Sequence, residues 1–180
     1  KVYLFNRSDN SLAYTITNTS GANYFANQGH AVSGNYLVLT DGSSTRKLFV
    51  YDISTFGSST IASANYTLTN PDKYGSSSND RFGSAIAIEG TKIVVAAARE
   101  QSSSGVAEDG VLYVYDISTF GSSVISSSAF SIDNPNYGSG TDTGDKHGET
   151  VAISEDYIVA GSRWNDTPFY SAGTIYIYNA

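Results

Sequence analysis

The feature that most constrains this chain is internal repetition with a period of about 64 residues. The nine residues from Tyr51 to Ser59 recur letter for letter from Tyr115 to Ser123, an offset of 64. Two further pairs recur at offsets of 64 and 65: Asn70-Pro71 with Asn134-Pro135, and Asp80-Arg81-Phe82-Gly83 with Asp145-Lys146-His147-Gly148. Repetition at a fixed period indicates one supersecondary unit that is built several times, each copy packing against the next.

Each unit contains the same four short runs, which are rich in β-branched and aromatic residues and bounded by Gly, Asn, Asp and Ser. The first is small and apolar, the second nearly continuous and apolar, the third alternating and the fourth short: for example Ser84–Ile88, Lys92–Ala97, Val111–Tyr115 and Ala129–Ile132. This composition predicts strands joined by turns, and no sustained period of 3.6 residues indicates a helix. We expect the second run to be buried on both faces and the third to have one less buried face.

The runs predict an all-β fold of β-propeller-like blades, each of four short antiparallel strands. The expected strands number two, four, four and three, about three blades in all. We expect one repeat-built β domain over residues 1–180, with a partial unit at 1–18, units at 19–70 and 71–134, and a partial unit at 135–180. Closed propellers have about four to eight blades, and Met is absent even at position 1. The expectation is therefore a segment of a larger propeller or assembly.

Two stretches resemble FG-GAP repeats, the units of the integrin-α-type β-propeller: Asp80 to Ile88 with Lys92 to Ala98, and Asp145 to Ile153 with Tyr157 to Ser162. Phe82-Gly83 matches the Phe-Gly of the family, and His147-Gly148 replaces it in the next unit. The resemblance implies a propeller fold and says little about function. The segments Val50 to Phe56 and Asn70 to Gly75 also look like repeats in tail-fibre-like virion proteins of marine phages and surface proteins of marine bacteria. That likeness implies an extracellular or virion-surface location.

Many FG-GAP repeats carry an Asp-rich calcium loop between their first two strands, and this chain departs from that pattern. Calcium needs several oxygen ligands that converge on one loop. The corresponding positions predict tight turns instead: Ser33-Gly34-Asn35, Glu89-Gly90-Thr91 and Ser154-Glu155-Asp156. The family's calcium site is therefore not carried over. The loop 137–145, with Asp142 and Asp145, could bind calcium through alternate carboxylates, and an ordinary long turn is the alternative.

Composition excludes several classes of function. The net charge is −7 and the ten Lys and Arg residues are scattered along the sequence, which argues against nucleic acid or an anionic membrane as a partner. No apolar run approaches the length of a membrane span, so no membrane insertion is expected. Cys is absent, which excludes disulfides and thiolate sites. With only His30 and His147, a zinc site would need carboxylates for most ligands, so no cofactor is expected besides the calcium noted above.

Most chemically capable residues have an ordinary structural interpretation. Asp80 and Asp145 recur at one place in the repeat, and a turn is needed in every unit whereas catalysis needs a residue once. His147 stands where the preceding unit has Phe82, which predicts a packing role. The loop 99–109 carries three acidic residues, and we expect a solvated loop rather than a pair of catalytic carboxylates.

Trp164 is the only Trp, lies in the loop 163–172, and is not repeated in another unit. Aromatic rings beside amide and carboxylate groups can stack on and hydrogen-bond a sugar. The predicted ligand-binding residues are therefore Arg163, Trp164, Asn165, Asp166 and Tyr170. The alternative is that the loop packs on itself or on another subunit.

These observations predict a non-enzymatic structural or adhesive module of an extracellular or virion assembly, such as a tail fibre or surface appendage. Its partners would be other copies or other chains of the assembly. Two alternatives stay open: a carbohydrate-binding module that recognises surface glycans through the Trp164 loop, and a propeller glycoside hydrolase or lyase with carboxylates converging from different blades.

Overall fold

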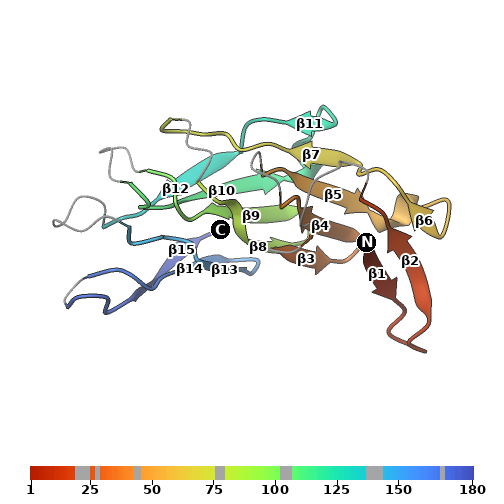
Figure 1. Cartoon of the computed structure of the whole chain (residues 1–180), viewed down its shortest axis with the longest axis horizontal. Helices are drawn as coiled ribbons and strands as arrows, with labels where there is room; N and C mark the ends of the chain where they lie inside the picture. The colour runs from red at the N-terminus through yellow and green to blue at the C-terminus, as the bar shows by residue number, and fades with distance from the viewer. Residues whose placement is uncertain are drawn as a thin grey trace.

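The computed structural model describes residues 1–18, 25–26, 29–42, 46–75, 80–101, 107–136, 144–166 and 169–180. Within these residues the fold is all-β, with fifteen strands and two single-turn 3₁₀ helices, Ile53–Thr55 (η1) and Ile117–Thr119 (η2) (Figure 1). The predicted all-β class is therefore confirmed. In the described part of the chain, no helix is long and apolar enough to cross a membrane.

The described strands form four open sheets, which we name A to D in chain order. Sheet A contains β1 (Val2–Phe5), β2 (Leu12–Ile16) and β6 (Thr60–Ile61). Sheet B contains, in spatial order, β11 (Val124–Ile125), β7 (Tyr66–Leu68), β5 (Leu48–Asp52), β4 (Tyr36–Thr40) and β3 (His30–Ser33). Sheet C contains β12 (Phe130–Asp133), β10 (Val111–Asp116), β9 (Lys92–Ala97) and β8 (Phe82–Glu89). Sheet D contains β13 (Thr150–Ile153), β14 (Tyr157–Ser162) and β15 (Thr174–Asn179).

The sheets follow one another in chain order across the molecule (Figure 1). The first strands of three successive units, β3, β8 and β13, lie side by side, and β8 contacts both of the others. Within each sheet the units' own strands pair antiparallel in chain order. The turns at Gly34 and Gly90 are tight, with φ of +54° and +55°, as the sequence predicts.

Sequence analysis missed the two shortest strands, β6 and β11. Each is two residues long and pairs in parallel with the sheet of the preceding unit, β6 with β2 and β11 with β7. Both follow a copy of the Phe-Gly-Ser-Ser segment. One short segment of each of these units therefore hydrogen-bonds to the sheet before it, which couples neighbouring sheets along the chain.

The nine-residue repeat has the same local structure in both copies. Asp52 and Asp116 end strands β5 and β10, and each carboxylate accepts the backbone N–H and the hydroxyl of the Ser two residues later, at 3.0 and 2.6 Å. This side-chain cap starts the 3₁₀ turn and ends the strand. Identical sequence thus gives an identical exit from the third strand of each unit.

Neighbouring sheets pack with the aliphatic face of one against the aromatic face of the next. Leu48 and Val50 of β5 pack in one cluster with Tyr113 and Tyr115 of β10. Two further clusters repeat this arrangement, one between sheets C and D and one between sheets A and B: Leu112 and Val114 with Ile158 and Tyr178, and Val2, Leu4 and Ile16 with Phe49 and Tyr51. Three successive interfaces therefore share one design.

This packing corrects one expectation about burial. Val111 to Tyr115 in β10 are all buried, although the alternating pattern predicted one less buried face. Both faces are covered because sheet B lies on one side and sheet D on the other. The strand that does have one exposed face is β15, where Ile175 and Ile177 are 72 % and 67 % exposed. The continuous run of β9 is buried from Ile93 to Ala97 as predicted.

The glycine of the Phe-Gly-type turn allows this close sheet packing. A Cβ on Gly148 would lie 2.5 Å from Leu112 and 2.9 Å from Ala96 of sheet C. A Cβ on Gly83 would lie 2.8 Å from Thr40 of sheet B. Both glycines also have positive φ, +87° and +80°, which an L side chain rarely adopts. The Phe-Gly-type turn therefore needs glycine at this position for the same physical reason in both units.

Candidate functional site

Each Asn-Pro step supplies an amide that holds the aspartate of the following turn. Asn70 donates to Asp80 at 3.2 Å, and Asn134 donates to Asp145 at 3.0 Å. Asn134 also donates to Asp109 at 2.8 Å. These aspartates are buried, so their recurrence reflects a polar frame that joins the loops at one end of sheets C and D.

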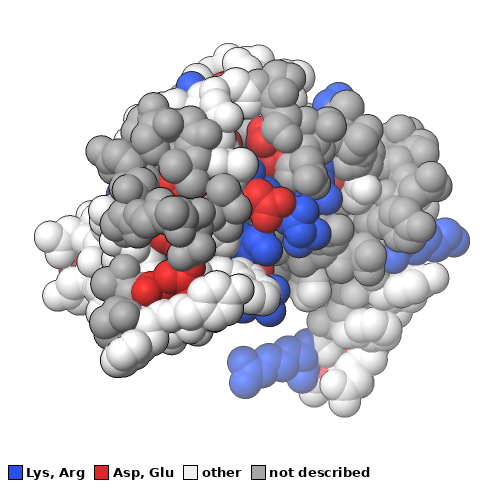
Figure 2. Space-filling model, turned by 60° about the vertical axis from the view of Figure 1, so that its left-hand side comes forward, with Lys and Arg blue, Asp and Glu red and all other residues white. Residues whose placement is uncertain are grey.

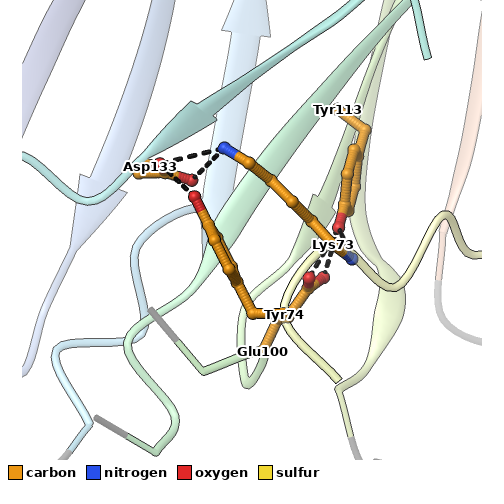
Figure 3. A network of polar contacts seen from close by, with 5 residues as sticks. All are labelled: Lys73, Tyr74, Glu100, Tyr113 and Asp133. Atoms are coloured by element: carbon orange, nitrogen blue, oxygen red, sulfur yellow. Dashed lines mark hydrogen bonds and ion pairs between the residues drawn. The ribbon is translucent and has the colours of Figure 1, made fainter. Parts of the chain in front are cut away.

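A second polar network fastens residues 70–75 onto sheet C (Figure 3). Tyr113 donates its hydroxyl to the carboxylate of Glu100, with oxygen distances of 2.6 and 2.7 Å, and accepts the backbone N–H of Lys73 at 3.1 Å. Lys73 Nζ and the hydroxyl of Tyr74 both bind Asp133, at 3.0 and 2.6 Å. Side chains from two loops and two strands are therefore held in one arrangement.

Glu100 is the acidic group in this network whose pKa is most perturbed. Burial, together with the neighbouring charge of Asp80, raises its pKa to about 7 against the opposing effect of the hydrogen bond from Tyr113. A raised carboxyl pKa is typical of catalytic acids, but Glu100 has no exposed surface. The expectation that its loop is solvated is wrong for Glu100 and for Asp109, which is 2 % exposed, because the loop turns both side chains into the polar interior.

His147 has the packing role that its position in the repeat predicts. It is fully buried, its Nδ1 lies 3.0 Å from the hydroxyl of Ser162, and its Nε2 lies 3.1 Å from the hydroxyl of Tyr178. Its ring meets Tyr176 edge to face at 5.2 Å, as Phe82 meets Tyr113 at 5.9 Å in the preceding unit. Burial lowers the pKa of His147 to about 4, so the ring is neutral at physiological pH.

The Trp164 loop is divided between structural and accessible residues. Asn165 is 1 % exposed and donates to Asp145 and Tyr176, which removes it from the predicted ligand-binding set. Asp166 accepts the backbone N–H of Ser171. Trp164 and Tyr170 are 39 % and 80 % exposed. Of the predicted site, Arg163, Trp164 and Tyr170 are therefore exposed, Asp166 is partly buried and Asn165 is buried.

Among the described residues, no set of calcium ligands converges on Asp145. Asp145 accepts hydrogen bonds from the amides of Asn134 and Asn165, and its proposed companion Asp142 lies outside the described residues. Among the residues that are described, no group of three His, Cys, Asp or Glu side chains could hold a metal ion.

A cleft of about 900 Å³ opens between the ends of sheets C and D. It is lined by four cations, Arg81, Arg99, Lys146 and Arg163, together with small residues and one carboxylate, Glu149. Lys146 and Arg163 also lie over the ring of Trp164, at 5.0 and 5.1 Å from its centre. Figure 2 shows Lys and Arg side chains gathering at the centre of the face that it presents.

Two carboxylates neutralise part of this charge. Glu108 binds Arg99 at 3.1 Å and Lys146 at 3.5 Å, and Glu149 binds Arg163. Among the described residues, the guanidinium of Arg81 makes no ion pair. The lining therefore keeps an excess of positive charge in a chain whose net charge is −7.

Sequence analysis named Arg163 as a predicted ligand-binding residue and did not name the other three cations of the cleft as such. One signal was present in the repeat: Arg81 and Lys146 occupy the same position of the Phe-Gly-type turn, 65 residues apart. The convergence of Arg99 and Arg163 depends on sheet packing, which the sequence pattern alone does not fix.

Comparisons with known proteins place a repeat of known type on this part of the chain. Residues 138–178 match the FG-GAP repeat. The chain thus carries an FG-GAP-type repeat that includes most of sheet D and the Trp164 loop. The matched segment begins seven residues before Asp145, so it includes the His147-Gly148 turn that stands in place of Phe-Gly.

Solved structures give two further likenesses. The crystal structure of the computationally designed Ika4 protein is 16 % identical, covers 91 % of this chain and 71 % of that chain, and has a TM-score of 0.49. The crystal structure of the computationally designed Ika8 protein is 14 % identical, covers 98 % of this chain and 51 % of that chain, and has a TM-score of 0.38. The comparison with curated proteins gives no match.

Proposed function

We propose that this protein is a non-enzymatic structural module whose propeller-like blades continue into further blades of the same kind, within an extracellular or virion assembly such as a fibre or surface appendage. The observation that carries the proposal is the state of the two end faces. Tyr3 and Phe5 of β1 correspond in the repeat to the buried Tyr113 and Tyr115, yet are 54 % and 63 % exposed. Ile175 and Ile177 of β15 correspond to the buried Leu112 and Val114.

The two ends are therefore the two halves of one interface. Within the chain, an aliphatic face meets an aromatic face three times. The first sheet presents an uncovered aromatic face and the last sheet an uncovered aliphatic face. Contiguous exposed apolar surface of this kind marks an interaction site, and faces that differ at the two ends associate head to tail.

The open sheet edges support the same proposal. In the described residues, β1 pairs only with β2, and β15 pairs only with β14. The corresponding strands β5 and β10 pair on both sides. Unpaired edges favour addition of further strands, so sheets A and D are suited to completion by a neighbouring blade.

Sedimentation velocity across a range of protein concentrations tests the proposal. The 180-residue chain is expected to associate, and Ile177→Asp is expected to shift it toward a 19.1 kDa monomer because the charge would be buried in the interface. Val124→Asp is the matched control, since Val124 is 56 % exposed on β11, away from both end faces. A stable monomer at all concentrations, or equal effects of the two variants, would contradict the proposal.

Two observations bear on the alternatives. The enzymatic alternative has less support because Glu100, the carboxyl group with the raised pKa, has no exposed surface. The glycan-binding alternative is favoured by the exposed Trp164 and by the cations that adjoin it. Glycan binding and assembly are compatible, because Trp164 and Arg163 lie in a loop outside the strands of both end faces.

A further inference from the structure

The cleft between sheets C and D concentrates positive charge that the rest of the chain lacks. Four of the ten Lys and Arg residues line it, although they come from four separate positions in the sequence. Arg81 and Arg99 belong to the third repeat unit, and Lys146 and Arg163 belong to the fourth. Its volume of about 900 Å³ lies within the range of sites for small organic ligands.

Part of the hydrogen-bonding capacity of these cations is unused. Arg81 is half-buried and makes no ion pair within the described part of the chain. The Nε of Arg99 is a buried donor without a hydrogen-bond partner among the described atoms. Burial, followed by the charges of Arg81 and Arg99, lowers the pKa of Arg46, so the guanidinium of Arg46 lies close enough to be repelled by each of the other two. A bound anion would relieve this repulsion.

An aromatic ring adjoins the same charges. Trp164 is 39 % exposed, and the cations of Lys146 and Arg163 contact its ring. An indole ring stacks on the apolar face of a sugar, while guanidinium groups form paired hydrogen bonds with carboxylate or sulfate groups. The hydroxyl-bearing Thr150 and Thr174 also line the cleft.

We propose that this cleft binds an acidic oligosaccharide, with its carboxylate or sulfate groups on Arg81 and Arg99 and one sugar ring against Trp164. A sugar chain with one charge per ring matches a small basic cleft in a chain that is acidic elsewhere. A nucleic acid carries a denser row of phosphates, which the surrounding acidic surface would repel. The inference does not depend on the assembly function, because the four cations lie outside the strands of the two end faces, although Ile175 of the last sheet also lines the cleft.

Calorimetric titration with hexagalacturonate at physiological salt tests the proposal. Binding is expected for the wild type, with sulfated oligosaccharide as a second probe and neutral maltohexaose as a non-binder. Arg81→Gln is expected to weaken hexagalacturonate binding about tenfold, the effect of losing a charged hydrogen bond. Arg7→Gln is the matched control, since Arg7 is exposed in the turn between β1 and β2 and is expected to bind as the wild type does.

Further measurements keep the outcomes separate. Arg163→Gln, at a side chain that is 67 % exposed, provides a second variant with little risk to folding, and thermal melting checks both. Sedimentation of Arg81→Gln should match the wild type, which distinguishes loss of ligand from loss of assembly. Absence of binding to either acidic oligosaccharide, equal binding by Arg81→Gln, or tighter binding of oligothymidylate or inorganic sulfate would overturn the proposal.

Discussion

Replacing Glu100 by Gln should make the stability of this protein less dependent on pH. Burial holds the pKa of Glu100 at about 7 in the folded protein, against 4.5 for an ordinary glutamate. At ~1.4 kcal/mol per pH unit, this difference corresponds to about 3 kcal/mol. Because the folded pKa is raised, the stability that Glu100 contributes is fully present below pH 4.5 and is lost as the pH rises through 7.

Glutamine keeps the shape and the hydrogen bond to Tyr113 without an ionisable group. The next repeat unit already shows a neutral version of this contact, since Asn165 Nδ2 donates to the hydroxyl of Tyr176 at 3.3 Å. We therefore expect Glu100→Gln to be more stable than the wild type at pH 8, and the advantage to shrink toward pH 4.5. The size of the change between these pH values is the quantity to compare with about 3 kcal/mol.

Urea unfolding of both proteins at pH 4.5, 6 and 8 measures this change. His147 also titrates in this range, and subtracting the wild type from the variant at each pH removes its contribution because both proteins contain it. Glu155→Gln makes the same chemical change in an exposed turn and should show no such trend. A difference between Glu100→Gln and wild type that is constant from pH 4.5 to 8 would refute the reasoning.

Two further predictions concern the Phe-Gly-type turn. Burial lowers the pKa of His147 from 6.5 to about 4, so the stability that this residue contributes is present above pH 6.5 and is lost as the pH falls through 4. The variant His147→Phe places at this position the residue that the preceding unit has, and it should remove this loss of stability at acid pH, as measured by urea unfolding. A variant whose stability falls with acid pH as steeply as that of the wild type would contradict the prediction. Gly148→Ala should lower the free energy of unfolding by about 3 kcal/mol, through strain at positive φ and contact with sheet C. Gly90→Ala, which has φ of +55° and no atom within 4 Å of its Cβ, should cost about 1 kcal/mol, and equal losses for the two glycines would show that sheet packing does not matter there.

The sequence was sufficient to predict most of the strands, because their signal is local and repeated. The run Lys92–Ala97 coincides with β9, and Val111–Tyr115 gives β10 apart from its last residue, Asp116. The strands β6 and β11 were missed because two residues carry no periodicity. Their pairing with the preceding sheet is also a long-range contact, which no local pattern specifies.

Burial of polar side chains was harder to predict than strands. Glu100 lies three residues after the end of β9, in a loop, and an acidic residue in a loop is exposed in most proteins. Glu100 is buried because β10 places the hydroxyl of Tyr113 beside its carboxylate, a contact that no local sequence pattern specifies. The cleft was missed for a related reason: Arg81 and Arg163 are 82 residues apart in the sequence, and sheet packing alone brings them to one opening.

Comparison of the repeat units distinguishes residues that serve the fold of every unit from residues found in one unit alone. Where two units carry the same residue, the structure gives that residue the same contact, as Asp52 and Asp116 show by capping identical turns. Where the units differ, the contact can still be kept: Glu100 accepts a hydrogen bond from the hydroxyl of Tyr113, and Asn165 donates one to the hydroxyl of Tyr176. Trp164 is not repeated, because the corresponding loop of the preceding unit contains no Trp. An exposed residue that is not repeated and that contacts two cations supports the proposal that a ligand is recognised here.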